Sequence, residues 1–165
     1  MSWWDRLRGR DLPVVAPGAP PEPALPPLPQ PVALLTEAAV RQLPPLALAH
    51  VGDAVYDLHV RTHVVLTGPA KPRELHRRTV SYVRATAQAA ALRALLPELN
   101  EAEADVVRRA RNARPAHIPK GVEAAEYAQA TGLEALLGYL YLTGQVGRLA
   151  QVLAAAVQAG PSRQS

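Results

Sequence analysis

From residue 32 onward, the chain is a series of apolar segments with helical spacing, separated by proline or glycine. Thr36 is placed to cap a short helix, which Pro44 and Pro45 end. Longer helices are predicted at about 46–66, 72–96, 98–112, 123–143 and 146–158. No stretch alternates apolar and polar residues for long enough to predict a strand. The spacing therefore predicts an all-α helical bundle.

The core of this bundle must be built from small and medium apolar side chains, because the 165 residues include no Phe, two Trp and five Tyr. Leu, Val and Ala pack well between helices. A chain of this length is expected to hold one domain with a substantial core. In the helix at 46–66, the inward stripe is expected to consist of Leu48, Val51, Val55, Leu58, Thr62 and Val65.

The absence of Cys excludes disulfides, thiolate metal sites and a Cys nucleophile. It is compatible with a reducing cytoplasm, and a cytoplasmic location is expected. No run of about 18 apolar residues predicts a transmembrane helix, so no membrane partner is expected. The N-terminal sequence MSWWDRLRGRD carries charges where a secretion signal needs its apolar region.

Proline dominates the N-terminal part of the chain, with nine prolines in residues 13–31. Proline lacks the amide hydrogen and breaks helices, so residues 1–31 are predicted to be a Pro-rich, disordered tail. Trp3 and Trp4 in this tail could form a short anchor. The folded domain is predicted at residues 32–160, followed by a C-terminal tail at 161–165.

Positive charge is concentrated in the middle of the chain. Residues 61–120 hold twelve Lys or Arg and five Asp or Glu, an excess of +7 in a chain of net charge +4. This excess favours a polyanionic partner, and the scarcity of aromatic residues favours duplex RNA over single strands. The candidate RNA-binding residues form two groups: Lys71, Arg73, Arg77, Arg78 and Arg84, and Arg108, Arg109, Arg111, Arg114 and Lys120. The alternative is that these arginines pair with Glu101, Glu103 or Asp105 and only solvate a helix end.

A glycine and an aspartate interrupt the apolar helix predicted at 46–66. Gly52 in mid-helix costs about 1 kcal/mol relative to Ala, and Asp53 lies off the inward stripe. Asp57 follows one turn later and could share a face with Asp53. Asp53 either bonds to water or another helix, or serves as an oxygen ligand for a hard cation.

A second carboxylate, Glu134, stands among apolar neighbours in the helix predicted at 123–143. A buried carboxylate is costly unless it is paired, hydrogen-bonded or bound to metal. Gly138, one turn later, permits close approach of another helix or a ligand. Two carboxylates on different helices suit Mg²⁺, but sequence spacing alone does not bring Asp53 and Glu134 together.

The pair His59 and His63 has the spacing of a helical zinc site. No third ligand accompanies the pair, so both are expected to be surface histidines.

Four stretches in order resemble the ribonuclease III family, and most closely its short Mini-III branch, which has no double-stranded-RNA-binding domain. They are LALAHVGDAVYDLHVR (46–61), KPRELHRRTVSYVRATAQA (71–89), VRRARNA (107–113) and TGLEALLGYLYLTG (131–144). The resemblance covers about residues 43–158, the length of a single folded domain.

This resemblance implies an all-α nuclease that acts as a homodimer and cleaves both strands of duplex RNA with Mg²⁺. Asp53 falls on the family's central catalytic aspartate and Glu134 on its essential glutamate, and both would hold the metal. Longer members carry further acids where this chain has Leu46, Ala49 and Thr131. The apolar Leu46, Ala49 and Val51 near Asp53 are candidates for the dimer interface.

For Mini-III, the resemblance also implies maturation of the precursor of large-subunit (23S-type) ribosomal RNA, with ribosomal particles as possible partners. A non-catalytic RNA-binding or ribosome-assembly module on the same fold is the alternative, motivated by the missing acids. A helical phosphohydrolase acting on nucleotides is a third reading, disfavoured because no His-Asp dyad is present.

Overall fold

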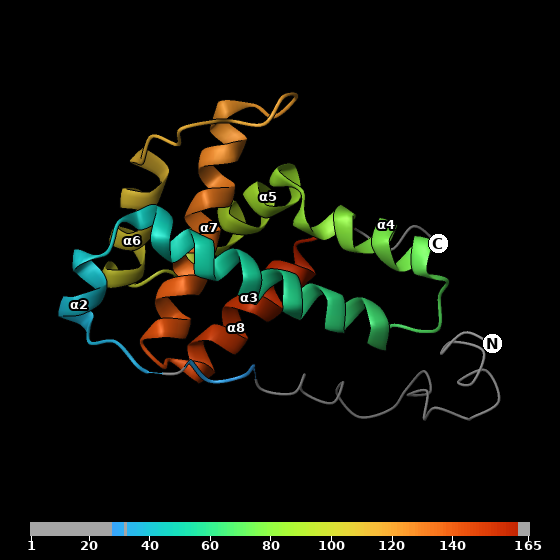
Figure 1. Cartoon of the computed structure of the whole chain (residues 1–165), viewed down its shortest axis with the longest axis horizontal. Helices are drawn as coiled ribbons and strands as arrows, with labels where there is room; N and C mark the ends of the chain where they lie inside the picture. The colour runs from blue at the N-terminus through green and yellow to red at the C-terminus, as the bar shows by residue number, and fades with distance from the viewer. Residues whose placement is uncertain (1–27, 32, 162–165) are drawn as a thin grey trace.

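The computed structural model describes residues 28–31 and 33–161, in which all regular structure is helical (Figure 1). The elements are α2 (Glu37–Gln42), α3 (Pro45–Leu66), α4 (Pro72–Val83), α5 (Ala85–Leu95), the 3₁₀ helix η1 (Leu96–Glu98), α6 (Glu101–Asn112), α7 (Ala124–Leu142) and α8 (Val146–Gln158). The predicted all-α fold is confirmed. Most of the tail predicted at 1–31, including Trp3 and Trp4, lies outside the described residues, as do residues 162–165.

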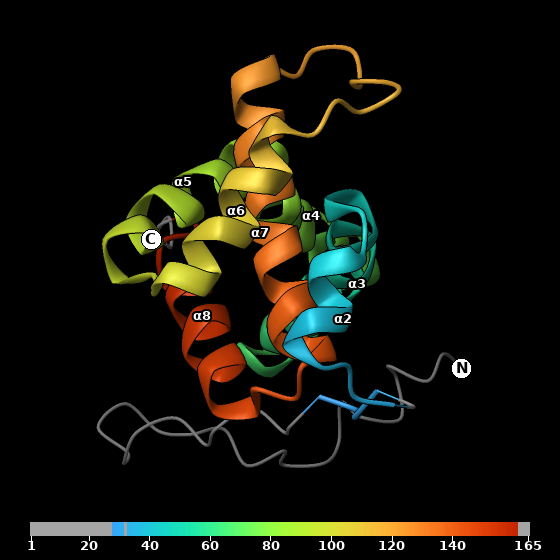
Figure 2. The same ribbon diagram turned by 90° about the vertical axis from the view of Figure 1, so that its left-hand side faces the viewer.

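Helix α7 is the centre of the bundle, with α3, α5, α6 and α8 packed around it (Figures 1 and 2). A helix that is apolar on every side is a buried one. Residues 130–140 of α7 are all buried except Glu134, which is half-buried. Glu134 is therefore the only ionisable carboxylate in the most apolar segment of the fold.

One buried ion pair ties α6 to α8. The Asn100 side chain caps α6 by accepting a hydrogen bond from the backbone amide of Glu103. The Glu103 carboxylate in turn accepts one from the backbone amide of Asn100. The same carboxylate, fully buried, accepts two hydrogen bonds from the Arg148 guanidinium of α8, at 2.7 and 2.9 Å. Arg148 also donates to the carbonyl of Glu98. The ion pair of Glu103 and Arg148 thus joins η1, α6 and α8.

The single helix predicted at 72–96 is wrong, because the chain breaks into α4 and α5 at Arg84. Arg84 has extended backbone angles, φ −62° and ψ 149°. The carbonyl of Val83 at this break accepts a hydrogen bond from the Gln88 side chain at 2.8 Å. A side-chain donor therefore replaces the backbone donor that a continuous helix would supply.

The predicted inward stripe of α3 is correct only in its first half. Leu48 and Val55 are buried, but Leu58 and Val65 are 44 % and 48 % exposed. The C-terminal half of α3 extends past α7 and lies beside α4 (Figure 1), so the face that is covered changes along the helix. His59 is buried on that covered face, which corrects its prediction as a surface residue.

Candidate active site at the crossing of α3 and α7

The backbones of α3 and α7 touch where they cross, at two glycines. A β-carbon on Gly52 would overlap the carbonyl of Glu134 and lie 2.8 Å from the Gly138 nitrogen. A β-carbon on Gly138 would in turn overlap the carbonyl of Leu48 and lie 3.1 Å from the Gly52 nitrogen. Gly52 is therefore required in mid-helix because the backbone of α7 occupies the space that a side chain would need. Gly138 plays the same role on α7.

This crossing brings Asp53 and Glu134 together, although 81 residues separate them in the sequence. Asp53 follows Gly52 directly, and Gly52 contacts the backbone of Glu134 itself. Burial and the nearby Asp53 carboxylate raise the pKa of Glu134 to about 7. Partial burial and Asp57 raise the pKa of Asp53, while His50 acts in the opposite direction. The Asp53 carboxylate thus disfavours the charged form of Glu134, as a nearby like charge does.

The Gln88 side chain of α5 is the third polar group of the crossing. Its Nε2 donates to Glu134 Oε1 at 3.1 Å, and its own Oε1 is buried without a partner. Among the described residues, no Lys or Arg forms an ion pair with Asp53 or Glu134. Two carboxylates and one unused amide oxygen form an all-oxygen set, which suits a hard divalent cation such as Mg²⁺.

The positions that carry further acids in longer family members supply no ligand here. Ala49 is 5 % exposed and packs in the core, so it cannot contribute to the dimer interface predicted with Leu46 and Val51. The Thr131 hydroxyl is buried and donates to the carbonyl of Tyr127 in its own helix. The resemblance does not point to Gln88. The sequence feature that could have indicated it is a single glutamine in the otherwise Ala- and Leu-rich segment ATAQAAALRALL.

The group of basic residues on α4 is partly engaged within the helix. Glu74 accepts hydrogen bonds from Arg77 and Arg78 at 2.8–2.9 Å, and these bonds lower its pKa to about 2. Lys71, Arg73 and Arg84 are exposed. Arg84 stands at the break between α4 and α5, four residues before Gln88. It is therefore the basic residue of this group that is nearest in the chain to Gln88.

The second basic group falls into two sets. Arg108 pairs with Asp105 on α6, which is the ion pair that the alternative to RNA binding predicts for this residue. Arg109 donates to the carbonyls of Arg41 and Leu43 at 3.1 and 3.4 Å and so caps the end of α2. The remaining members are exposed and form no ion pair among the described residues: Arg111, Arg114 and Lys120. Residues 113–123, which hold two of them, form a loop that projects from the helical body (Figures 1 and 2).

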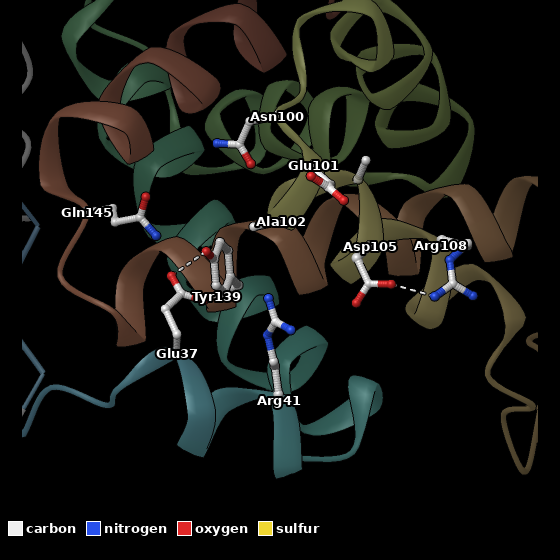
Figure 3. A pocket seen from close by; sticks show the side chains of 10 residues that line it. Glu37, Arg41, Asn100, Glu101, Ala102, Asp105, Arg108, Tyr139 and Gln145 are labelled. Carbon is white, nitrogen blue, oxygen red and sulfur yellow. Dashed lines mark hydrogen bonds and ion pairs between the residues drawn. The ribbon is translucent and has the colours of Figure 1, made fainter.

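An open polar hollow of about 900 Å³ lies elsewhere, between α2, α6 and the end of α7 (Figure 3). Tyr139 donates to Glu37 at 2.6 Å across one side of it, and Arg108 pairs with Asp105 on another. These four side chains already bond to one another in pairs. The hollow contains neither Asp53 nor Glu134 and is separate from the candidate active site.

Among the described residues, no three His, Asp or Glu side chains form a cluster that could hold a metal ion. Burial, with His63 nearby, lowers the pKa of His59 to about 4. His63 stacks edge-on against Tyr82 with ring centres 5.7 Å apart. His63 therefore contacts α4.

Residues 46–145 match the family model of the Ribonuclease III domain. The chain belongs to the ribonuclease III family. It is 54 % identical over 114 residues to Mini-ribonuclease 3 of Symbiobacterium thermophilum, an alignment that covers 69 % of this chain and 88 % of the relative. It is 49 % identical over 125 residues to Mini-ribonuclease 3 of a Thermoanaerobacter species, covering 76 % and 88 %.

A crystal structure of a Fusobacterium nucleatum protein has the same fold, with a TM-score of 0.66 and 25 % identity over 72 % of this chain and 95 % of that one. Together the matches confirm the Mini-III branch and an endoribonuclease of the ribonuclease III type. No helix in the described part of the chain is long and apolar enough to cross a membrane.

Proposed function

We propose that the chain cleaves both strands of double-stranded RNA in a magnesium-dependent reaction, with Asp53 and Glu134 as the catalytic, metal-holding pair. The observation that carries this proposal is the contact of α3 and α7 at Gly52, which brings Asp53 close enough to Glu134 to raise the pKa of that carboxyl group. Among the described residues, neither carboxylate forms an ion pair with a Lys or Arg. Their mutual repulsion is relieved by a shared cation. Members of the ribonuclease III family act on double-stranded RNA.

When bound, the ion lowers the pKa of a water molecule and stabilises charge that develops on the scissile phosphate. The chain's own contribution is rigidity and charge. Asp53 and Glu134 stand on helices whose backbones touch, so their separation does not depend on a loop. The acidic pair supplies the negative oxygens, and the exposed Arg84 and the projecting loop at 113–123 supply positive charge for the RNA backbone.

Cleavage of two strands requires two active sites, because each chain holds one acidic pair. We therefore propose a homodimer. Exposed apolar side chains on α3, Leu58, Val65 and Leu66, offer a surface for self-association. The precursor of large-subunit ribosomal RNA is the proposed substrate, on the basis of the likeness to Mini-ribonuclease 3 proteins. Contact with ribosomal particles and a cytoplasmic location accord with that substrate.

The test compares Asp53→Asn with Asp57→Asn, a matched change one turn along the same helix. Asp57 pairs with Arg61 at 2.6 Å on the surface, and such a pair contributes little. With Mg²⁺ and a duplex from the ribosomal RNA precursor, we expect Asp53→Asn to lower the cleavage rate by about three orders of magnitude. Asp57→Asn should stay within about threefold of the wild type.

EDTA should abolish cleavage by the wild type. Equal rates for the two variants would contradict the assignment of Asp53. If the wild type binds the duplex and leaves it intact with Mg²⁺, the chain is a non-catalytic RNA-binding module. An unrelated duplex cut as fast as the ribosomal precursor would overturn the proposed substrate while leaving the nuclease activity in place.

A further inference from the structure

Gln88 is buried beside the acidic pair, with 3 % of its surface exposed. It stands on α5, where its neighbours Ala87 and Ala89 are small and apolar. A polar side chain at such a position is costly unless its hydrogen bonds are satisfied. Its two nitrogen-bound hydrogens and its oxygen therefore have to be accounted for one by one.

Both donors of the Gln88 amide are used. Nε2 donates to the Val83 carbonyl at 2.8 Å and to Glu134 Oε1 at 3.1 Å. A carbonyl and a carboxylate only accept hydrogen bonds, so the nitrogen, and not the oxygen, must face them. The bond to Val83 fixes the amide at the break between α4 and α5, and the bond to Glu134 fixes one carboxylate oxygen.

The third polar atom of the amide, Oε1, is buried and has no hydrogen-bond partner. Because the two donors determine which way the amide lies, this oxygen cannot be exchanged with the nitrogen. It is an acceptor attached to a group that already touches Glu134. Mg²⁺ in protein sites keeps several of its waters, and such waters are donors.

We propose that Gln88 is a positioning residue for the cation site. It holds Glu134 Oε1 so that the other carboxylate oxygen stays available to the ion, and its own Oε1 accepts a hydrogen bond from a water of the ion's hydration shell. This inference rests on the proposed function, because it presumes that Asp53 and Glu134 hold the ion. Gln88 would thus supply an oxygen near the ion in a chain where Ala49 and Thr131, which replace the acids of longer family members, supply none.

A purely structural role makes a different prediction. If Gln88 only caps the end of α4 through Val83, its loss lowers stability and leaves cation binding unchanged. Groups that orient metal ligands typically contribute 10–100-fold to metal affinity when they are removed. The affinity of the RNA-free protein for a cation therefore separates the two roles.

The experiment uses Gln88→Leu, which keeps similar volume and removes all three hydrogen-bonding atoms. The control is Leu92→Val, one turn later on α5, where a fully buried side chain is shortened without touching the amide. Mn²⁺ is titrated into the metal-free, RNA-free full chain by calorimetry, and cleavage of a duplex RNA is measured separately. The wild type and Asp53→Asn are titrated in parallel.

We expect Gln88→Leu to weaken Mn²⁺ binding by about tenfold or more and to lower kcat with little change in KM for RNA. Leu92→Val should bind Mn²⁺ like the wild type. A folded Gln88→Leu that binds Mn²⁺ within about twofold of the wild type overturns the inference in favour of the structural role.

Asp53→Asn distinguishes this failure from failure of the proposed function. Loss of binding in Asp53→Asn with full binding in Gln88→Leu overturns the role of Gln88 alone. Full binding in Asp53→Asn overturns the ion site itself, and the role of Gln88 with it.

Gln88→Glu keeps the test decisive should Gln88→Leu fail to fold. It retains an acceptor oxygen at the same length, adds a negative charge and removes both donors. We expect its Mn²⁺ affinity to equal or exceed that of the wild type, with a lower kcat because Glu134 is no longer held. A tenfold loss of affinity in this variant would contradict an oxygen contact to the ion's shell.

Discussion

Replacing Gly52 with Ala tests whether the contact of α3 and α7 sets the geometry of the acidic pair. A β-carbon at this position lies 2.6 Å from the carbonyl carbon of Glu134 and 2.8 Å from the nitrogen of Gly138. Carbon atoms in contact are normally about 3.5–4.0 Å apart. The same β-carbon would overlap the carbonyl oxygen of Glu134. All of these neighbours are backbone atoms that no rotamer change can move, so the helices must separate by more than about 1 Å.

Two opposing effects set the magnitude. Ala stabilises a helix interior by about 1 kcal/mol relative to Gly, whereas overpacking of a well-packed contact costs about 1–3 kcal/mol and more where backbone must shift. We expect a net loss of about 2 kcal/mol in the free energy of unfolding, or about 8 °C in Tm. The shift also separates Asp53 from Glu134, and a 1 Å displacement of catalytic groups costs about 100-fold in rate.

Gly147→Ala is the matched control, because a β-carbon on Gly147 in α8 meets nothing within 4 Å. That variant should keep full activity and gain up to about 1 kcal/mol. Urea unfolding gives the stability of both variants, and single-turnover cleavage of duplex RNA below Tm gives their rates. If Gly52→Ala is as stable and as active as the wild type, α3 and α7 do not set the spacing of the acidic pair.

The remaining predictions concern charge and assembly. The folded pKa of Glu134, about 7, exceeds the ordinary 4.5, so in metal-free protein this group stabilises the fold below pH 4.5 and its contribution is lost as the pH rises through 7. Glu134→Gln should therefore be more stable than the wild type at pH 8, by about 1–3 kcal/mol, with little difference at pH 4.5. Urea unfolding without metal measures this difference, and a difference that does not grow with pH would refute the prediction. Changing Arg111, Arg114 and Lys120 together to Ala should raise KM for duplex RNA more than it lowers kcat and flatten the salt dependence of binding by up to about three units of slope; an unchanged slope removes the loop from the RNA surface. Leu58→Asp should yield monomers in sedimentation experiments that no longer cut both strands, and a stable active dimer of this variant would move the interface elsewhere.

The helix limits were largely predictable because local chemistry determines them. Thr36 caps α2, Pro45 begins α3 and Gly144 follows α7 with a positive φ of 71°, and each residue acts on its own neighbours in the chain. The break at Arg84 was not predictable in this way, since no proline or glycine marks it. It depends on the Gln88 side chain, whose placement requires α7 to be in position.

The candidate site shows the same division between local and distant causes. Gly52, Asp53, Glu134 and Gly138 stand out in the sequence because each is unfavourable where it is found. That the two segments meet, and that Gln88 joins them, are contacts between residues 46 or more positions apart. Likewise, the sequence could not separate Arg109, which caps α2 across 66 residues, from arginines that are free to bind RNA.

The buried pair of Glu103 and Arg148 restricts how this sequence can drift over evolutionary time. Removing Arg148 alone strands the fully buried Glu103 carboxylate in the interior, at a cost of about 3–5 kcal/mol, whereas replacing both with apolar residues is often neutral or stabilising. Two acceptable sequences are thus separated by intermediates of low fitness. Positions 103 and 148 should accordingly change together or not at all among descendants of this chain. Residue 100 is not bound by this constraint, because its bond to the Glu103 carboxylate is donated by the backbone amide.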